Sequence, residues 1–126
     1  MLYKTPAEKK EFDDLIYKNP KLANIMHALD FFCTCSFGKQ ITITEVFRTQ
    51  EEHDKLYAAT DPALRPKTSP HCTYQAIDVR SSDYSDPQIQ RMLGFLNCFV
   101  NSNGKAVAIY HKIAGNAYHF HVQYFI

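Results

Sequence analysis

The sequence predicts an α+β domain in which helices pack against a small, mostly antiparallel sheet. Helical patterns come first along the chain, and short runs that alternate between apolar and polar residues follow, mixed with further helical patterns. This order is typical of α+β domains. With 126 residues, of which 45% are apolar, the chain is near the usual size for one domain with one core, so we expect a single domain over residues 1–126.

Two helices are expected before the first strand. Residues Thr5–Glu8 have the form of a capping box with proline at the first helical position, which predicts a helix through about Tyr17. The pair Asn19-Pro20 repeats this start. Apolar residues then recur at helical spacing and predict a second helix that ends before Gly38, a residue suited to a helix C-terminus.

A strand and a helix are expected to meet at Arg48. The run Gln40–Phe47 alternates and is rich in β-branched residues, which predicts a strand. Thr49 and Glu52 form a capping box directly after it, so a helix should follow, with Arg48 at the junction. We expect His53, which lies near acidic residues on that helix, to be exposed to solvent.

Turn formers, capping residues and alternating runs predict the remaining elements. These are a loop at 60–70, a strand at 73–80, a helix that starts at Ser85, and strands at 105–111 and 116–126 separated by a hairpin turn at Lys112–Gly115.

Charge and hydropathy exclude some partners. The 14 Lys and Arg residues and 13 Asp and Glu residues give a net charge of +1, which offers no electrostatic attraction to nucleic acid or to an anionic membrane. No apolar run approaches the ~18 residues that span a bilayer, and the N-terminal residues lack the apolar segment of a signal peptide. We expect a monomer that is cytoplasmic as synthesised. Its four cysteines are expected to be buried free thiols.

Metal-ligand side chains gather in two stretches of the sequence. The first contains His71 and, seven residues later, Asp78, and the second contains His119 and His121. Imidazole and carboxylate groups suit a borderline cation such as Zn²⁺, and a catalytic zinc usually has three protein ligands and a water. Two histidines and one aspartate fit that number.

Alternation along the expected strands indicates how these side chains can meet. Over residues 117–126, apolar side chains at every second position fall on one face, which leaves His119 and His121 on the other. The same alternation places Asp78 opposite its apolar neighbours. On two half-buried strands, the side chains of Asp78 and His121 can thus point to a common position. His71 would reach the same position from the loop that precedes the first strand.

These motifs resemble one known family. The string S-x-H-x-x-x-x-A-x-D, which begins at Ser69, and the late H-x-H are similar to those of the zinc peptidases of peptidoglycan. These are the D-alanyl-D-alanine carboxypeptidases and dipeptidases and the L-alanyl-D-glutamate endopeptidases of phage lysins, with the hedgehog/DD-peptidase fold. The segment Thr42–Tyr57 looks like the family's arginine segment, in which a strand ends in an arginine just before a helix. The resemblance spans about residues 41–123.

The resemblance implies a site and a mechanism. It assigns Zn²⁺ to His71, Asp78 and His121, where the metal would activate water for attack on a peptide carbonyl. Separately from the resemblance, we expect His119 to be the general acid/base, because histidine exchanges protons near neutral pH. Arg48 would either stabilise the oxyanion or anchor a substrate carboxylate, and both roles stay open.

Three further positions bear on the resemblance. Ser69 stands where the family hydrogen-bonds substrate, and it equally fits a serine turn at the end of the loop. Many members have glycine where Gln75 stands, and many have an acidic general base where Tyr118 stands. The identity of the base therefore stays open.

The implied partner is the peptidoglycan stem peptide, cut either at the terminal D-Ala or between L-Ala and D-Glu. A wall peptidase with neither signal nor wall-binding module suggests a phage lysin, a virion-borne lytic component or a cytoplasmic enzyme that trims muropeptides. Two other classes stay open. One is a non-catalytic zinc-binding domain of the same fold that acts as a structural or binding module. The other is an iron(II) oxygenase, whose two histidines and one carboxylate usually include a closer His-x-Asp pair.

Overall fold

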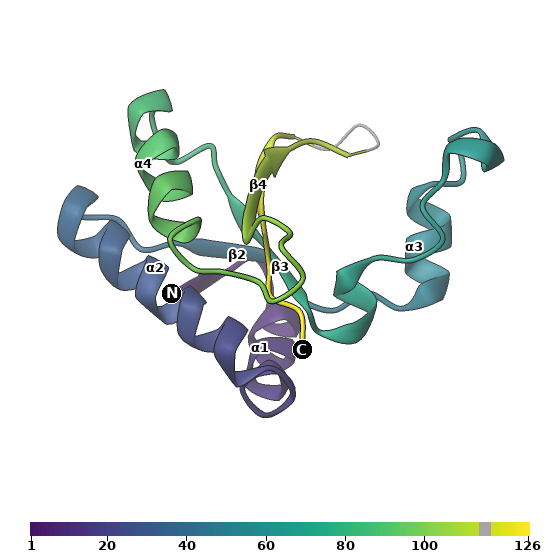
Figure 1. Cartoon of the computed structure of the whole chain (residues 1–126), viewed down its shortest axis with the longest axis horizontal. Coiled ribbons are helices and arrows are strands. Elements are labelled where there is room, and N and C mark those ends of the chain that lie inside the picture. Colours follow the sequence, from purple (N-terminus) through teal and green to yellow (C-terminus); the bar gives the residue numbers. More distant parts are fainter. Residues whose placement is uncertain (114–116) are drawn as a thin grey trace.

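The computed structural model describes residues 1–113 and 117–126, and in these residues the chain forms a mixed sheet covered by helices (Figure 1). The helices are α1 (Pro6–Lys18), α2 (Pro20–Phe37), α3 (Gln50–Leu56) and α4 (Asp86–Leu96). The strands are β1 (Leu2–Tyr3), β2 (Thr42–Glu45), β3 (Ala76–Arg80), β4 (Ala108–His111) and β5 (His119–Gln123). The 3₁₀ turns η1 (Pro62–Leu64) and η2 (Pro70–Thr73) precede β3. The predicted α+β class is confirmed.

Within the part of the chain that the structure describes, the strands lie in the order β1-β2-β3-β5-β4. β1 and β2 are parallel and the other neighbours are antiparallel, so the sheet is mostly antiparallel, as predicted. The sequence pattern does not predict β1, because two residues are too few to show alternation. In the central pair, Asp78 on β3 lies opposite His121 on β5. The topology thus places the two stretches that carry the expected metal ligands side by side.

The helix starts follow the predicted capping signals. Capping boxes begin α1, α3 and α4, and Asn19 caps α2. Gly38 ends α2 with a φ of 67°, a left-handed conformation that a residue without Cβ adopts readily. β2 is shorter than predicted and covers only Thr42–Glu45. The chain leaves the sheet there, because the backbone amide of Arg48 donates to the carbonyl of His71 (3.2 Å) and not to a strand.

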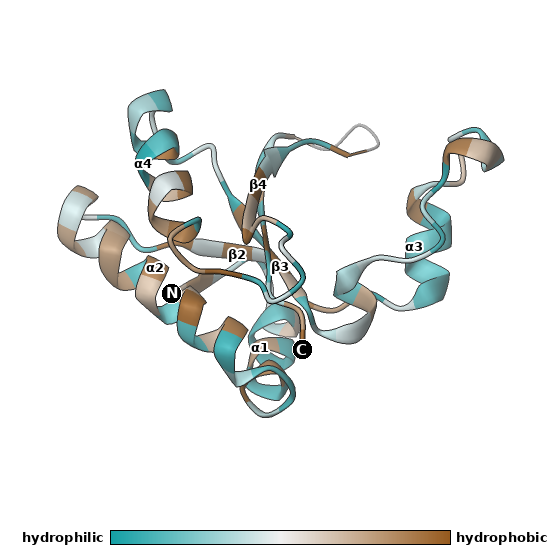
Figure 2. Ribbon diagram, in the orientation of Figure 1, coloured by the Kyte–Doolittle hydropathy of each residue, from teal (hydrophilic) through white to brown (hydrophobic). Residues whose placement is uncertain are grey.

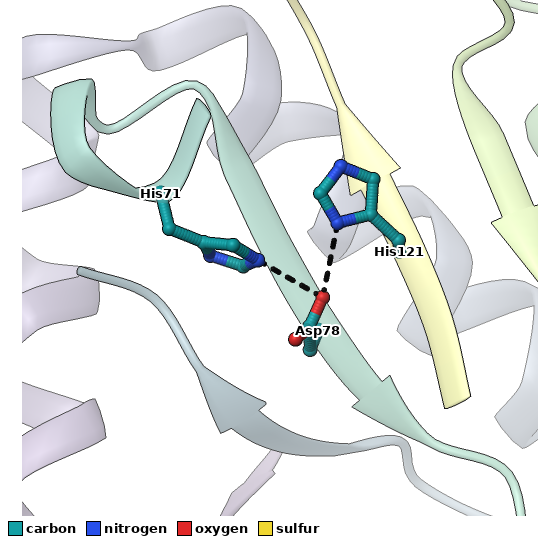
Figure 3. Close-up of side chains that lie close together, drawn as sticks. All are labelled: His71, Asp78 and His121. Atoms are coloured by element: carbon teal, nitrogen blue, oxygen red, sulfur yellow. Dashed lines mark hydrogen bonds and ion pairs between the residues drawn. The ribbon is translucent and has the colours of Figure 1, made fainter. Parts of the chain in front are cut away.

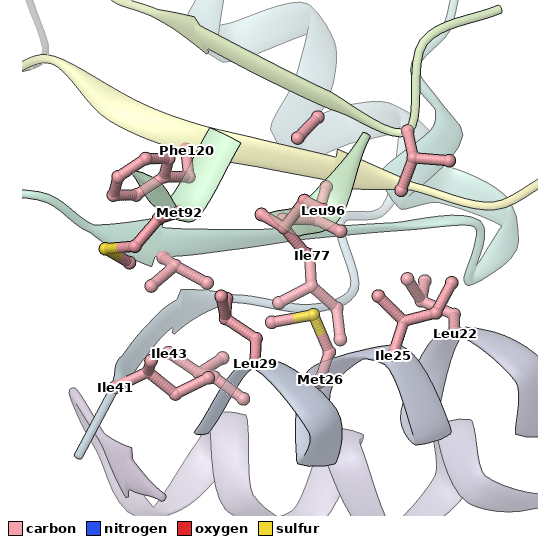
Figure 4. Close-up of a cluster of buried hydrophobic side chains, with 14 of the residues drawn as sticks. Leu22, Ile25, Met26, Leu29, Ile41, Ile43, Ile77, Met92, Leu96 and Phe120 are labelled. Carbon is pink, nitrogen blue, oxygen red and sulfur yellow. The ribbon is translucent and has the colours of Figure 1, made fainter. Parts of the chain in front are cut away.

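The core lies between one face of the sheet and the helices α1, α2 and α4. Figure 4 shows apolar side chains of α2 pointing up to the sheet, where they meet side chains of α4, β2, β3 and β5. Burying one such side chain contributes about 1.5–3 kcal/mol to folding. In Figure 2, α2 carries brown, hydrophobic turns, whereas α3 is mostly hydrophilic. The residues at 0% exposure in this core include Leu22, Met26, Leu29, Ile77, Val79, Met92, Leu96, Phe120 and Val122.

The segment that contains α3 and η1 extends away from the other helices (Figure 1). His53 on α3 is 1% exposed, so the expectation of an exposed His53 is wrong. The proline-containing loop folds back over it, and its Nε2 lies 2.9 Å from the carbonyl of Pro66. Its ring also packs against Tyr57, with ring centroids 4.9 Å apart. Local sequence could not show this, because the covering residues come from the following loop.

Other expectations have mixed outcomes. All four cysteines are free, but only Cys33 is buried, while Cys35 and Cys98 are exposed and Cys72 is half-buried. β4 and β5 pair in antiparallel fashion, as a hairpin requires, although residues 114–116 of the expected turn lie outside the described residues. No helix among the residues described is long and apolar enough to cross a membrane.

Candidate metal centre

Three side chains from separate elements converge on one point (Figure 3). Asp78 comes from β3, His121 from β5 and His71 from η2. Asp78 Oδ1 lies 3.1 Å from His71 Nε2 and 3.2 Å from His121 Nδ1. The residues are buried, with exposed fractions of 1% for His71, 5% for Asp78 and 6% for His121. The fold therefore brings together the three residues that the sequence indicates as metal ligands.

The turn η2 holds His71 over the strand pair. Ser69 caps this turn, and its Oγ accepts a hydrogen bond from the backbone amide of His71 (3.2 Å). Tyr74 ends the turn with a φ of 56°, a conformation that few non-glycine residues adopt. Its ring stacks on Phe47 with centroids 4.7 Å apart, which helps to fix the turn. The left-handed position is thus Tyr74 and not Gln75, so this turn does not require glycine at Gln75.

A hydrogen bond outside the cluster fixes the tautomer of His71. Its Nδ1 lies 3.2 Å from the backbone carbonyl of Val46, which can only accept. Nδ1 therefore carries a hydrogen, and Nε2, which faces Asp78, is the nitrogen that can bind a metal ion or a proton. Metal-binding histidines usually have such a second partner, which orients the ring.

Gln123 does the same for His121. Its Nε2 donates to the carbonyl of Ala106 (2.8 Å), which turns its Oε1 toward His121 Nε2 (3.1 Å). His121 Nε2 must then be the donor, which leaves the lone pair of Nδ1 facing Asp78. Gln123 is 6% exposed and lies two residues after His121 on the same face of β5. The sequence analysis missed this role, although alternation places both side chains on one face.

The donor set fits a metal ion. Two imidazole lone pairs and a carboxylate oxygen repel one another unless a cation or a proton lies among them. Zinc bonds of about 2.0–2.2 Å at tetrahedral angles separate ligand atoms by about 3.3–3.5 Å. The nitrogens of His71 and His121 lie at 3.1 and 3.2 Å from Asp78 Oδ1, close to that spacing. All three ligand atoms lie within 4.8 Å of one another, so the cluster can hold a metal ion.

Asp78 and the histidines of the cluster shift each other's pKa values. Burial alone would raise the pKa of Asp78, but His71 and His121 outweigh it and hold that pKa well below its usual range. Burial alone would lower the pKa of His71, but the Asp78 carboxylate outweighs it and raises that pKa. Asp78 therefore stays ionised, and positive charge is favoured between the two histidines.

Arg48 lies beside the cluster and is already paired. It is 4% exposed, its Nε donates to Glu45 Oε1 at 2.9 Å, and its Nη2 donates to Glu45 Oε2. Its Nη1 lies 3.4 Å from His53 Nδ1. Glu45 Oε2 is in turn 3.8 Å from His71 Nε2, so Glu45 connects Arg48 to the cluster. The sequence analysis missed Glu45, because only the pairing of β2 with β3 places it opposite Asp78.

A cavity of about 360 Å³ opens beside the cluster. Glu45, Asp78 and His119 are among the side chains that line it, together with Arg80 and Lys4. His119 Nε2 lies 3.4 Å from Asp78 Oδ2, the carboxylate oxygen that does not face the other two histidines. Of the predicted site residues, Asp78 and His119 thus line the cavity. In the described part of the chain, Arg48 and Ser69 do not line it.

A fourth histidine, His111 on β4, packs against the site and was not predicted. It pairs with His119 in the β4–β5 register, and its ring centroid lies 4.9 Å from that of His119 and 5.4 Å from that of His121. Burial and these neighbouring histidines lower the pKa of His111. Its place depends on strand pairing, which the sequence spacing does not specify.

The sequence was also compared with known proteins. No protein-family model matches the chain, and no curated protein matches it significantly.

Proposed function

We propose that the protein is a zinc metallopeptidase that hydrolyses peptide bonds of the peptidoglycan stem peptide. The observation that carries this proposal is the convergence of His71, Asp78 and His121 beside a cavity that His119 lines. A catalytic zinc takes three imidazole or carboxylate ligands and leaves one position for water or substrate. The cluster offers this donor set next to space for a substrate, and the motif resemblance supplies the substrate class.

Hydrogen bonds outside the cluster orient the two candidate histidine ligands. When bound, zinc lowers the pKa of a coordinated water to about 7 and polarises a carbonyl oxygen. His71 and His121 would bind it through the nitrogens that face Asp78, because Val46 and Gln123 hold their other ring nitrogens. Asp78 would supply the charged ligand.

The proposal assigns to His119 the exchange of a proton with the substrate. Its Nδ1 donates to the backbone carbonyl of Ala117 at 3.1 Å, so its Nε2 is the basic atom. Nε2 lies 3.4 Å from Asp78 Oδ2, is buried, and has no hydrogen-bond partner among the described residues, while other atoms of His119 line the cavity. In the proposed reaction, His119 accepts at Nε2 the proton that the attacking water gives up and delivers it to the departing amine.

Existing hydrogen bonds limit how Arg48 and Ser69 could contact the substrate. The guanidinium of Arg48 is paired with Glu45, so a substrate oxygen must share or displace that carboxylate. Ser69 uses Oγ as an acceptor in its turn, which leaves the hydroxyl hydrogen to donate to a substrate.

One observation favours a second function, a zinc-binding module without catalysis. Tyr118 stands where many of the resembled peptidases have an acidic base, and its side chain is 51% exposed. Glu45 is an acidic group that lines the cavity, but its two oxygens are bound by Arg48. In this reading the cluster would stabilise the fold or bind a partner group.

Mass spectrometry of purified muropeptides after incubation with the zinc-loaded protein tests the choice. We expect loss of one alanine, or cleavage between L-Ala and D-Glu, with the unmodified protein and not with Asp78→Ala. His119→Ala should keep its zinc and lose turnover by about 10²–10⁴-fold, the usual contribution of a general acid/base. Intact muropeptides with a full zinc complement would reject the peptidase and favour the binding module.

A further inference from the structure

The cavity beside the metal cluster contains two positively charged side chains, Arg80 and Lys4. Arg80 follows Asp78 by two residues on β3, so both side chains lie on the same face of the strand. In the strand register Arg80 lies opposite His119. The backbone amide of Lys4 bonds to the carbonyl of Ile43 (2.9 Å), which holds this residue at the edge of the sheet. The cavity therefore continues from the metal ligands toward two cations.

These cations differ from Arg48 in what they contact. Arg48 is buried and bound by Glu45. Among residues 1–113 and 117–126, no carboxylate lies within 4.0 Å of the side-chain nitrogens of Arg80 or Lys4. Arg80 is half-buried and Lys4 is exposed, so both charges are accessible from the cavity. They are free to bind an anionic group of a ligand.

We propose that Arg80, assisted by Lys4, binds a carboxylate of the substrate next to the bond that is cut. This proposal rests on the proposed peptidase function and deepens it, because it names the substrate class as an acidic peptide. Two residues of a strand span about 7 Å, and consecutive Cα atoms of a peptide are about 3.8 Å apart. A carboxylate one residue from a bond held at Asp78 can therefore reach Arg80. The planar fork of a guanidinium matches a carboxylate with two hydrogen bonds.

The other charges of the cavity favour one carboxylate over a polyanion. Glu45 and Asp78 line the same space, so a ligand with several negative charges would meet two carboxylates as well as two cations. A volume of about 360 Å³ is also near the lower limit of small-ligand sites, about 300–1,000 Å³. The cavity therefore suits a short peptide segment with a single negative charge.

The stem peptide offers this chemistry from two sources. A carboxypeptidase substrate has the terminal carboxylate of D-Ala one residue beyond the scissile bond. An endopeptidase substrate that is cut before D-Glu has the α-carboxylate of D-Glu at the corresponding place. Both present a carboxylate to the same cations, and amidation of one or the other tells them apart.

The test is calorimetric binding of three synthetic pentapeptides L-Ala-γ-D-Glu-L-Lys-D-Ala-D-Ala: unmodified, amidated at the C-terminus, and amidated at the D-Glu α-carboxylate. Zinc-loaded protein with His119→Ala is used, so that turnover does not disturb the titration. We expect one amidation to weaken binding about tenfold or more, the usual loss for a charge-assisted hydrogen bond. Arg80→Gln should weaken binding of the unmodified peptide by the same factor as that amidation does. The variant should then bind the unmodified and amidated peptides alike. Lys4→Gln should show a smaller effect of the same kind. Lys10→Gln is the matched control, because this substitution also removes one positive charge and Lys10 is an exposed residue of α1.

The outcomes separate this proposal from the proposed function. If all three peptides bind equally, or if none binds, the carboxylate site is rejected. If Arg80→Gln remains folded by circular dichroism and keeps the preference, Arg80 is not the anchor. Cleavage is measured separately by mass spectrometry with the unmodified protein. Carboxylate-dependent binding without cleavage would support the carboxylate site at Arg80 and reject the peptidase function. Cleavage that is unaffected by either amidation would support the peptidase function and reject the carboxylate site.

Discussion

The two faces of the β3–β5 pair share one backbone and one register, yet one face forms the core and the other carries the candidate metal ligands. Both faces are almost fully buried, so burial alone does not distinguish them. The core face carries Ile77, Val79, Phe120 and Val122, each at 0% exposure. The polar face carries Asp78, His121 and Gln123, at 5–6% exposure.

The difference lies in how each face compensates for burial. Apolar side chains gain free energy simply by leaving water, at about 25 cal/mol per Å². Buried polar groups lose hydration and must recover it through hydrogen bonds. On the polar face, the two ligand histidines recover it through Val46 and Gln123, but the contacts with Asp78 still set lone pairs against a carboxylate. The core face therefore needs no further group, whereas the polar face has a place for a metal ion or a proton among its ligand atoms.

The largest expected effect is on the core face. Phe120→Ala removes a fully buried ring and should lower the free energy of unfolding by about 3–5 kcal/mol, because it leaves a cavity in the packed core. Urea unfolding of the zinc-loaded protein measures this loss. Tyr118→Ala is the matched control on the same strand segment, since Tyr118 is 51% exposed and should change stability by less than about 1 kcal/mol. Equal losses for the two variants would show that Phe120 does not carry the core.

The polar face should respond in the opposite way. Asp78→Asn keeps the size of the side chain but removes the charged ligand, so zinc affinity should fall by more than the roughly 10–100-fold that loss of a histidine's second partner costs. Without metal, and at a pH at which both histidines are neutral, stability should be maintained, because the new amide can donate to one of the two lone pairs that face position 78. Competition with a chelator measures the affinity, and urea unfolding of the metal-free proteins measures the stability. Unchanged zinc affinity would exclude Asp78 as a ligand.

The same comparison shows what the sequence can and cannot predict. Alternation and capping signals act within a few residues, so they predicted the helix starts and placed Asp78 and His121 on the polar face. Glu45 and His111 were missed, because they reach the site only through pairing with β3 and β5. His53 was wrongly expected to be exposed, because a later loop covers it. Contacts between distant segments depend on register and loop shape, and a local pattern specifies neither.

Gln123 shares a property with each face: it is buried like the core residues, and it hydrogen-bonds His121, a candidate metal ligand. Gln123→Leu keeps a side chain of similar size but removes the acceptor of His121 Nε2. The imidazole of His121 can then adopt either tautomer or turn, so zinc affinity should fall by about 10–100-fold. The carbonyl of Ala106 also loses the shorter of its two hydrogen bonds (2.8 Å) and keeps the one from Asn101 Nδ2 (3.4 Å), so stability should fall by about 0.5–1.5 kcal/mol.

Gln123→Glu separates these two consequences. Its carboxylate still accepts from His121 Nε2, so zinc affinity should stay near that of the unmodified protein, but it has no hydrogen to donate to Ala106 and stability should still fall. Affinity from chelator competition and stability from urea unfolding are therefore expected to move together in Gln123→Leu and apart in Gln123→Glu. If zinc affinity falls equally in both, the acceptor on His121 is not what orients the ligand. The polar face would then depend on packing, as the core face does.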